Sequence, residues 1–184
     1  TRTTYTKPID FFRLFFTIDI VKSIVTHTNS YAWANITKKQ SYGNKEGAWK
    51  NTTSAEIMTF IALLIYQGFV NVSTHARYWS TKSLYHGLWA RKFLSRNRYT
   101  ALLGMLHVVD VSEEDPTKKL RKVDSFIEHF RAKCKELFQP FQNIAIDERL
   151  VKSKHRSGIR QYIANKPAKF GLKLWVLADS SSGY

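Results

Sequence analysis

The feature of this sequence that most constrains its fold is a change in the spacing of apolar residues at Pro140. Before Pro140, apolar residues recur about every 3.6 positions, which is the period of an amphipathic helix. After it they alternate, as in residues 171–178, and every second side chain would then face the same side of a sheet. Proline also ends the preceding helix, because it has no backbone N–H. The sequence therefore predicts an α+β fold, with a helical region over residues 1–140 and a sheet over residues 141–184.

The helices expected before Pro140 cover residues 8–29, 53–68, 95–109 and 124–138. Thr53 and Glu56 form a capping-box pattern, and Asp124 is expected to cap the last helix. Residues 31–51 have no clear period, so a loop is predicted there. Cys134 lies on the apolar face of the last helix, which favours a buried packing residue over a reactive thiol.

The strands expected after Pro140 cover residues 142–151, 159–163 and 171–178. The short connections between them predict an antiparallel meander. A small sheet of this kind has one apolar face with little to pack against. We therefore expect that face to be exposed and the chain to self-associate.

The charge of the chain points to a polyanion as partner. There are 29 Lys and Arg residues against 14 Asp and Glu, for a net charge of +15. Basic surfaces bind nucleic acid by neutralising its phosphates; a membrane surface or a merely soluble basic protein is the alternative. An apolar fraction of 43% excludes wholesale disorder, and a single cysteine excludes an internal disulfide. No apolar stretch approaches the roughly 18 residues that span a bilayer, and no helix pairs a continuous basic face with an apolar one, so no membrane association is expected. The candidate DNA contacts are the basic residues of two dense clusters and one connection: Arg91, Lys92, Arg96, Arg98, Lys118, Lys119, Arg121, Lys122, Lys152, Lys154 and Arg156.

Asp147 is the one acidic residue whose position suggests chemistry. It follows three apolar residues within the first predicted strand, where a carboxylate is costly unless it is paired or binds a metal. A local ion pair with the adjacent Glu148–Arg149 segment is one interpretation, and a ligand for a hard cation such as Mg²⁺ is the other. Asp179 lies in a Ser- and Gly-rich stretch and is predicted to be a turn residue.

Several motifs resemble those of the piggyBac transposase family. The sequence IDERL spans Ile146–Leu150, and the NKPxKxGxKxW pattern spans Asn165–Trp175. Four motifs nearer the N-terminus also have the order and spacing of the family: THTNSYA (Thr26–Ala32), the pair Tyr78–Trp79, SRNRY (Ser95–Tyr99) and LHVVD (Leu106–Asp110). Two positions depart from its pattern: His155 stands where the family has Gly, and Ala164 stands where it has Pro.

The resemblance implies a helical dimerisation and DNA-binding region over residues 1–140, followed by the first three strands of an RNase H-like domain of the DDE/DDD type. Family members cut and paste DNA elements at TTAA targets, using three aspartates that hold two divalent ions, Mg²⁺ or Mn²⁺. Asp147 matches the first aspartate, and nothing in this sequence matches the others. The resemblance also implies DNA and a second copy of the chain as partners, and the nucleus as location.

From this we predict that the chain alone does not cleave DNA, because one aspartate cannot hold two metal ions. Two other functions stay open. The chain could come from a domesticated, non-enzymatic DNA-binding or interaction protein, or it could be a decayed transposon fragment.

Overall fold

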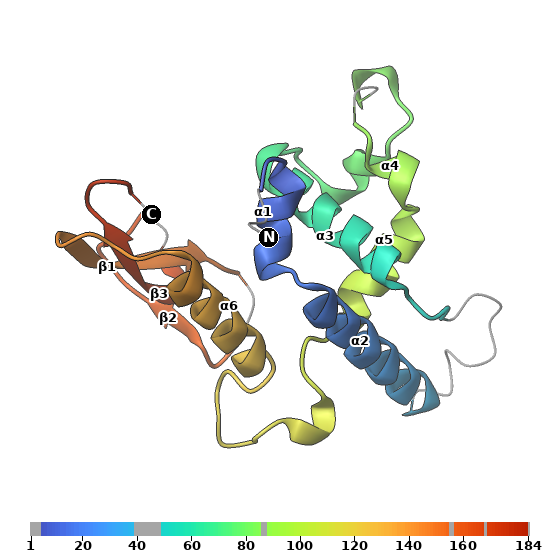
Figure 1. Cartoon of the computed structure of the whole chain (residues 1–184). Helices are drawn as coiled ribbons and strands as arrows, with labels where there is room; N and C mark the ends of the chain where they lie inside the picture. The colour runs from blue at the N-terminus through green and yellow to red at the C-terminus, as the bar shows by residue number, and fades with distance from the viewer. Residues whose placement is uncertain (1–4, 39–48, 86–87, 155–156, 168, 184) are drawn as a thin grey trace. The chain divides into compact units, whose positions relative to one another are not determined.

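The computed structural model describes residues 5–38, 49–85, 88–154, 157–167 and 169–183 (Figure 1). The chain divides into two compact units, Thr1–Glu114 and Asp115–Tyr184. The first is helical, and the second combines one long helix with an antiparallel sheet, so the predicted α+β fold is confirmed. The functional division at Pro140 stays a prediction. Within the described ranges, no helix has both the length and the apolar character needed to cross a bilayer.

The helices of the first unit are α1 (Pro8–Phe15), α2 (Ile18–Lys38), α3 (Ser54–Phe69), η1 (His75–Trp79), η2 (Ser83–Tyr85), α4 (Ala90–Phe93), α5 (Arg96–Met105) and η3 (Val111–Glu113). The second unit contains α6 (Asp124–Leu137), β1 (Ile144–Lys152), β2 (Arg160–Tyr162) and β3 (Phe170–Asp179).

The first predicted helix is two helices, with a break at Phe16–Thr17. The Thr17 hydroxyl accepts a hydrogen bond from the Ile20 N–H at 3.3 Å, as a cap does. The predicted loop over residues 31–51 is wrong at its start, because α2 continues to Lys38; residues 39–48 lie outside the described residues.

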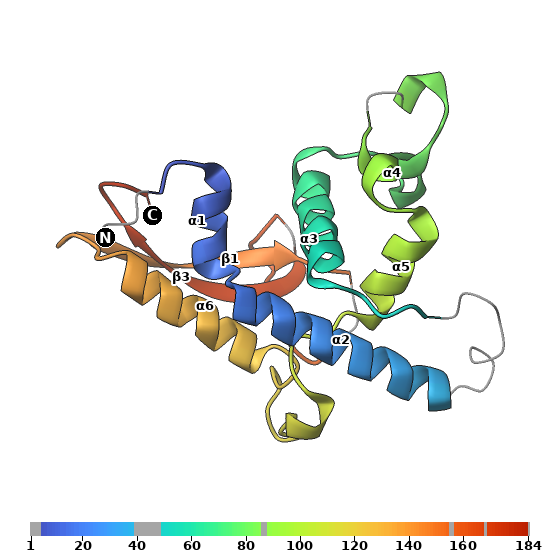
Figure 2. The ribbon, with the colours of Figure 1, turned by 45° about the vertical axis from the view of Figure 1, so that its right-hand side comes forward.

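The core of the first unit forms where α2, α3 and α5 pack together (Figure 2). The Thr53 hydroxyl caps α3 by accepting from the Glu56 N–H at 3.3 Å. Only this half of the predicted capping box forms, because the Glu56 carboxylate turns to Arg98 instead. The largest fully buried apolar side chains at this junction come from α3 and α5: Ile57, Phe60, Leu63, Tyr99 and Leu102.

The sheet has the order β1-β3-β2, so the predicted meander is wrong. β3 lies in the centre and pairs with β1 from Ile144↔Asp179 to Lys152↔Gly171. β2 is only three residues long and pairs with the first residues of β3. The longest ladder thus joins β1 and β3, the first and last strands in the sequence, and the short β2 forms an edge of the sheet.

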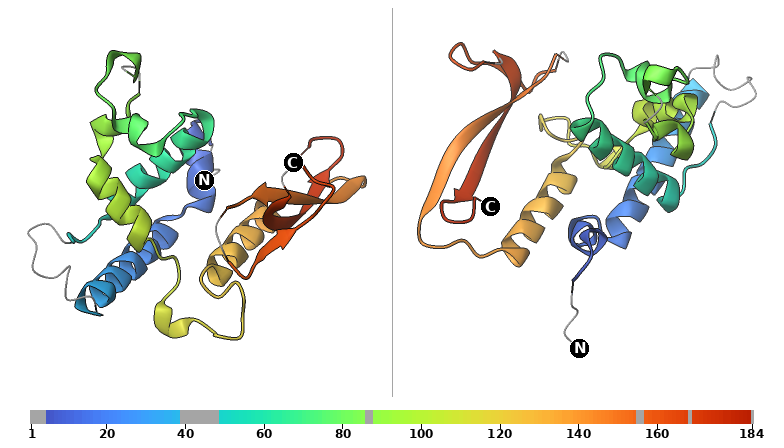
Figure 3. Two further views of the ribbon diagram at one scale, coloured as in Figure 1. Left: turned by 180° about the vertical axis from the view of Figure 1, so that it is seen from behind. Right: turned by 90° about the horizontal axis from the view of Figure 1, so that it is seen from above.

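The sheet leaves large apolar side chains exposed, as expected from its size. On the face shared by Ile146, Trp175 and Leu177, these side chains are 67%, 70% and 54% exposed. Helix α6 runs beside the sheet (Figure 3) but contains no fully buried residue. The prediction that Cys134 is buried is therefore wrong: its helix is covered too little, and the thiol is exposed.

Candidate functional site

Asp147 lies on β1, the strand that the sequence predicts for it. It is the fourth of nine residues, and therefore nearer the start of the strand than in the predicted range 142–151, because β1 runs from Ile144 to Lys152. Its neighbour across the sheet is Val176 of β3. The carboxylate is exposed, and its Oδ1 accepts a hydrogen bond from the Glu148 N–H at 2.7 Å. A carboxylate in this position is open to a ligand from outside the strand.

The register of β1 and β3 separates Asp147 from the other charged residues of the sheet. Side chains alternate along a strand, so Glu148 points to the opposite face, where it forms an ion pair with Lys173. The Lys166 ammonium lies 4.0 Å from the same carboxylate. The ion pair of this segment is therefore between Glu148 and Lys173 and does not include Asp147. Arg149 lies on the same face of the sheet as Asp147.

Asp179 fills a structural role at the end of β3, as predicted for a turn residue. It is 1% exposed. Its Oδ1 accepts from the N–H groups of Ser181 and Ser182 at 2.9 and 2.8 Å, and its Oδ2 accepts from the Phe141 N–H at 2.7 Å. Hydrogen bonding from Ser182 and Phe141 to the charged carboxylate lowers the pKa of Asp179. Because it pairs with Ile144, Asp179 lies on the face opposite Asp147.

Asp147 is the candidate ligand for a metal ion among the residues that the structure describes. Among the described residues, no group of three or more His, Cys, Asp or Glu side chains is arranged to hold one. An exposed carboxylate at Asp147 suits a hard cation such as Mg²⁺, which prefers oxygen ligands.

The first basic cluster has both exposed and engaged members. Arg91 and Lys92 on α4 and Arg96 on α5 are exposed. Arg98, also on α5, is half-buried, and its guanidinium binds both oxygens of Glu56, with Nε–Oε1 and Nη2–Oε2 distances of 2.8 and 2.7 Å. Within the part of the chain that the structure describes, Arg98 therefore has a carboxylate partner that the other three lack.

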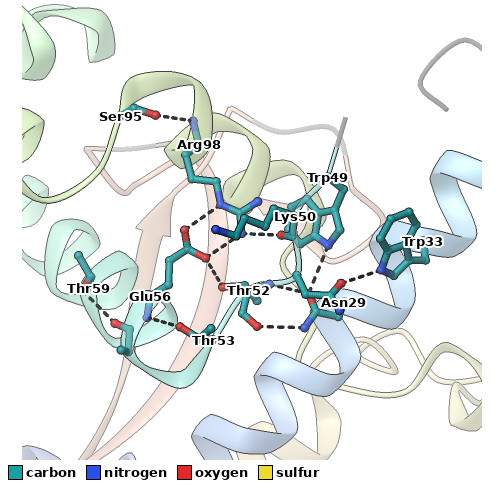
Figure 4. A network of polar contacts seen from close by, with 12 residues as sticks. Asn29, Trp33, Trp49, Lys50, Thr52, Thr53, Glu56, Thr59, Ser95 and Arg98 are labelled. Atoms are coloured by element: carbon teal, nitrogen blue, oxygen red, sulfur yellow. Dashed lines mark hydrogen bonds and ion pairs between the residues drawn. The ribbon is translucent and has the colours of Figure 1, made fainter. Parts of the chain in front are cut away.

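Arg98 belongs to a network that joins α2, α3 and α5 (Figure 4). Its Nη2 also donates to the Lys50 carbonyl at 2.7 Å, and the guanidinium lies 4.6 Å from the centre of the Trp49 ring. Asn29 extends the network by accepting from the Thr52 N–H at 2.8 Å. The hydrogen bonds from Arg98 lower the pKa of Glu56, against the opposing effect of its burial.

The remaining predicted DNA contacts lie in the second unit. Lys119 and Lys122 are exposed, and Arg121 is half-buried. The Lys118 ammonium lies 2.9 Å from the Asp124 carboxylate, which raises the pKa of that lysine. Lys152, the last residue of β1, and Lys154 just beyond it are exposed. Arg156 lies outside the described residues.

Two basic residues that sequence reasoning missed lie beside Arg91 and Arg96. Arg77 on η1 and Lys82 in the next loop line the same groove as these two residues. Neither belongs to a dense basic cluster in the sequence, so charge density alone could not find them. Only the fold brings them together.

A family model described as Transposase IS4 matches residues 7–184. The chain is 26% identical over 168 residues to human PiggyBac transposable element-derived protein 3, covering 91% of this chain and 26% of that protein. With human PiggyBac transposable element-derived protein 5 it shares 27% identity over 180 residues, covering 96% of this chain and 33% of that protein. The chain thus spans about a quarter to a third of the length of these relatives.

A solved structure extends the similarity to three dimensions. It is a cryo-EM structure of a piggyBac transposase synaptic complex with hairpin DNA. The two chains superpose with a TM-score of 0.78 and 28% identity, over 98% of this chain and 38% of the other. The sheet of the second unit accordingly corresponds to the start of an RNase H-like transposase domain. The chain belongs to the piggyBac-type transposase family.

Proposed function

We propose that this chain is the portion of a piggyBac-type transposase, or of a protein derived from one, that binds DNA and supplies the first catalytic aspartate, Asp147. The observation that carries the proposal is the match over 98% of the chain to a transposase that was solved with hairpin DNA. Exposed cations that form no ion pair among the described residues, such as Arg91, Lys92 and Arg96, support it, because they are available for phosphates.

Asp147 is proposed as a ligand of a divalent ion, Mg²⁺ or Mn²⁺, together with carboxylates from outside the described residues. When bound, such an ion polarises a phosphate oxygen and stabilises the charge that develops during phosphoryl transfer. The part of this chain is to hold one carboxylate on β1, which pairs with β3 along its whole length, and to bind DNA. TTAA targets, a homodimer and a nuclear location belong to the same proposal.

A second candidate is a non-enzymatic DNA-binding or interaction protein derived from a transposon. The names of the human relatives, transposable element-derived proteins, favour it. In this case the DNA-binding surface would act without Asp147, and a substitution of Asp147 would leave the function intact.

A salt titration tests the DNA-binding proposal directly. Binding of the chain to a labelled DNA duplex should weaken linearly on a log–log plot against salt, with a slope of about −0.9 for each neutralised phosphate. Lys22→Gln serves as the control, since Lys22 is exposed and lies outside the predicted contacts; its slope should equal that of the wild type. A flat slope, or no binding at low salt, would contradict the proposal.

A further inference from the structure

An open groove in the first unit is lined by basic side chains. Its volume is about 640 Å³, and its walls come from η1, the loop after η1, α4 and the start of α5. Among the described residues that line it, four are basic and none is acidic. The basic residues are Arg77, Lys82, Arg91 and Arg96.

These cations reach the groove from separate parts of the chain. All four side chains are exposed, and within the described residues none of them forms an ion pair. Arg77 stacks over the Tyr85 ring, 5.3 Å from its centre, which holds the guanidinium in place without neutralising it. Like charges held in one concavity repel each other and focus a positive potential there. A bound anion would relieve that repulsion.

The walls of the groove are fixed by the half-buried Trp79 and the buried Tyr99. The Trp79 Nε1–H donates to the Leu94 carbonyl at 2.6 Å, which ties η1 to the end of α4. The Trp79 ring lies 4.9 Å from the ring of Tyr99, whose hydroxyl donates to Gln67 Oε1 at 2.7 Å. Since Tyr99 is only 1% exposed, this wall is anchored in the core of the unit. The groove is therefore formed before a ligand arrives, which reduces the ordering cost of binding.

The polar residues that line the groove suit a phosphate more than a base. Ser80, Thr81 and Ser95 present hydroxyls beside the four cations. Hydroxyls, arginines and lysines are the usual partners of phosphate oxygens in DNA complexes. No Asn or Gln, the residues that read adenine, occurs among the described lining residues.

We propose that this groove binds the phosphodiester backbone of DNA, with Arg77, Lys82, Arg91 and Arg96 contacting neighbouring phosphates. The inference rests on the proposed DNA binding and assigns it to a specific surface. Contacts of this kind position a duplex and are independent of its sequence. Arg98 forms an ion pair with Glu56, so it stabilises the unit and does not contact phosphate.

The test compares equal charge changes inside and outside the groove. The first variant is Arg91→Gln/Arg96→Gln, and the second is Arg77→Gln/Lys82→Gln, which removes the other two cations of the groove. The control is Lys22→Gln/Lys50→Gln, which removes two exposed charges from the same unit but does not touch the lining. Each protein is titrated with salt against two labelled DNA duplexes of unrelated sequence, and circular dichroism checks its folding.

Each groove variant should make the salt slope shallower by about 1.8, since about 0.9 is lost with each phosphate contact. Affinity at moderate salt should fall by about tenfold or more, equally for both duplexes. The control should keep the wild-type slope. Arg91→Lys/Arg96→Lys, which retains the charge, should restore most of the slope.

The outcomes separate this inference from the proposed function. Wild-type DNA binding with equal slopes for the groove variants and the control would overturn the groove and leave DNA binding intact. A loss confined to one duplex would overturn the backbone assignment, because it would indicate base reading. No binding by the wild-type chain would overturn both.

Discussion

At Arg98, one guanidinium meets a carboxylate, a backbone carbonyl and an indole ring. The side chains of Arg98 and Glu56 are only 18% and 24% exposed, so removing one partner leaves a partly buried charge. We expect Arg98→Met to lower the free energy of unfolding by about 2–3 kcal/mol. Urea denaturation followed by far-ultraviolet circular dichroism measures it. Arg96→Met, on the same helix and exposed, should change stability by less than about 0.5 kcal/mol; equal effects would contradict the structural role of Arg98.

The same ion pair predicts a pH dependence. The pKa of Glu56 is lowered from its usual 4.5 in the folded chain, so folding favours the ionised form. Its contribution to stability is complete above pH 4.5 and disappears as the pH falls through the lower folded value. The stability difference between the wild type and Glu56→Gln, measured by thermal unfolding, should therefore be largest near neutral pH and shrink in acid. A difference that is constant down to acid pH would argue against the ion pair.

Within the sheet, Gly171 is where three strands crowd together. It pairs with Lys152 on one side and Gln161 on the other. A Cβ added at Gly171 would overlap the Val151 carbonyl oxygen and lie 2.9 Å from the carbonyl carbon, and neither backbone atom can move without breaking the ladder. Gly171→Ala should therefore cost about 2–3 kcal/mol.

Hydrogen exchange followed by mass spectrometry measures the effect of Gly171→Ala, as lost protection of the β1 amides. Gly158→Ala is the matched control, because a Cβ there meets nothing within 4 Å. Wild-type protection in Gly171→Ala would show that β1 and β3 are not in the register described.

The elements that the sequence predicted well carry their own local signals. Ser95 was placed at the start of a helix, and its hydroxyl accepts from the Arg98 N–H at the first turn of α5. The strands were placed within about two residues of their observed ends, because alternation is a local pattern. Strand order was not predictable in this way. It depends on β1 pairing with β3, which follows β2 in the sequence, and such a non-local pairing leaves no local pattern.

The roles of side chains also divide into those with a local signal in the sequence and those that depend on distant segments. The proposal that Asp147 is a metal ligand rests on motifs within a few residues of it and stays a prediction, whereas the groove brings Arg77 and Arg91 together from segments with no common pattern. Cys134 was misplaced because a helical period shows which face is apolar but not whether anything covers that face.

For the whole chain, the uncovered sheet predicts self-association. Ile146 and Trp175 are among the most exposed apolar residues of the sheet and share one face. The chain should show a concentration-dependent mass in sedimentation experiments, and Ile146→Lys/Trp175→Lys should abolish it by placing charge on the shared surface. Leu84→Lys is the control, since Leu84 is 83% exposed but lies in the other unit. Association that persists in the sheet variant would assign it to another surface.

The carboxylates of the sheet determine what we expect of the whole chain toward DNA cleavage. Glu148 and Asp179 lie on the face opposite Asp147, and both are engaged, by Lys173 and by backbone amides respectively. No second carboxylate of these strands can therefore join Asp147 at one ion. We expect the chain not to nick supercoiled plasmid DNA in Mg²⁺ or Mn²⁺. Nicking that Asp147→Asn abolishes would contradict this.

The Asp179 carboxylate also has a mechanical consequence. It holds the amide of Phe141, just before β1, and the amides of Ser181 and Ser182, just after β3. These points lie at the same end of an antiparallel ladder, so tension applied between them would peel the strands apart one residue pair at a time instead of shearing all pairs at once. The first bonds to bear that load are those that join the two strand ends, from the Phe141 N–H to the Asp179 carboxylate and from the Ser180 N–H to the Asn143 carbonyl, and the force that opens the sheet from this end is set there.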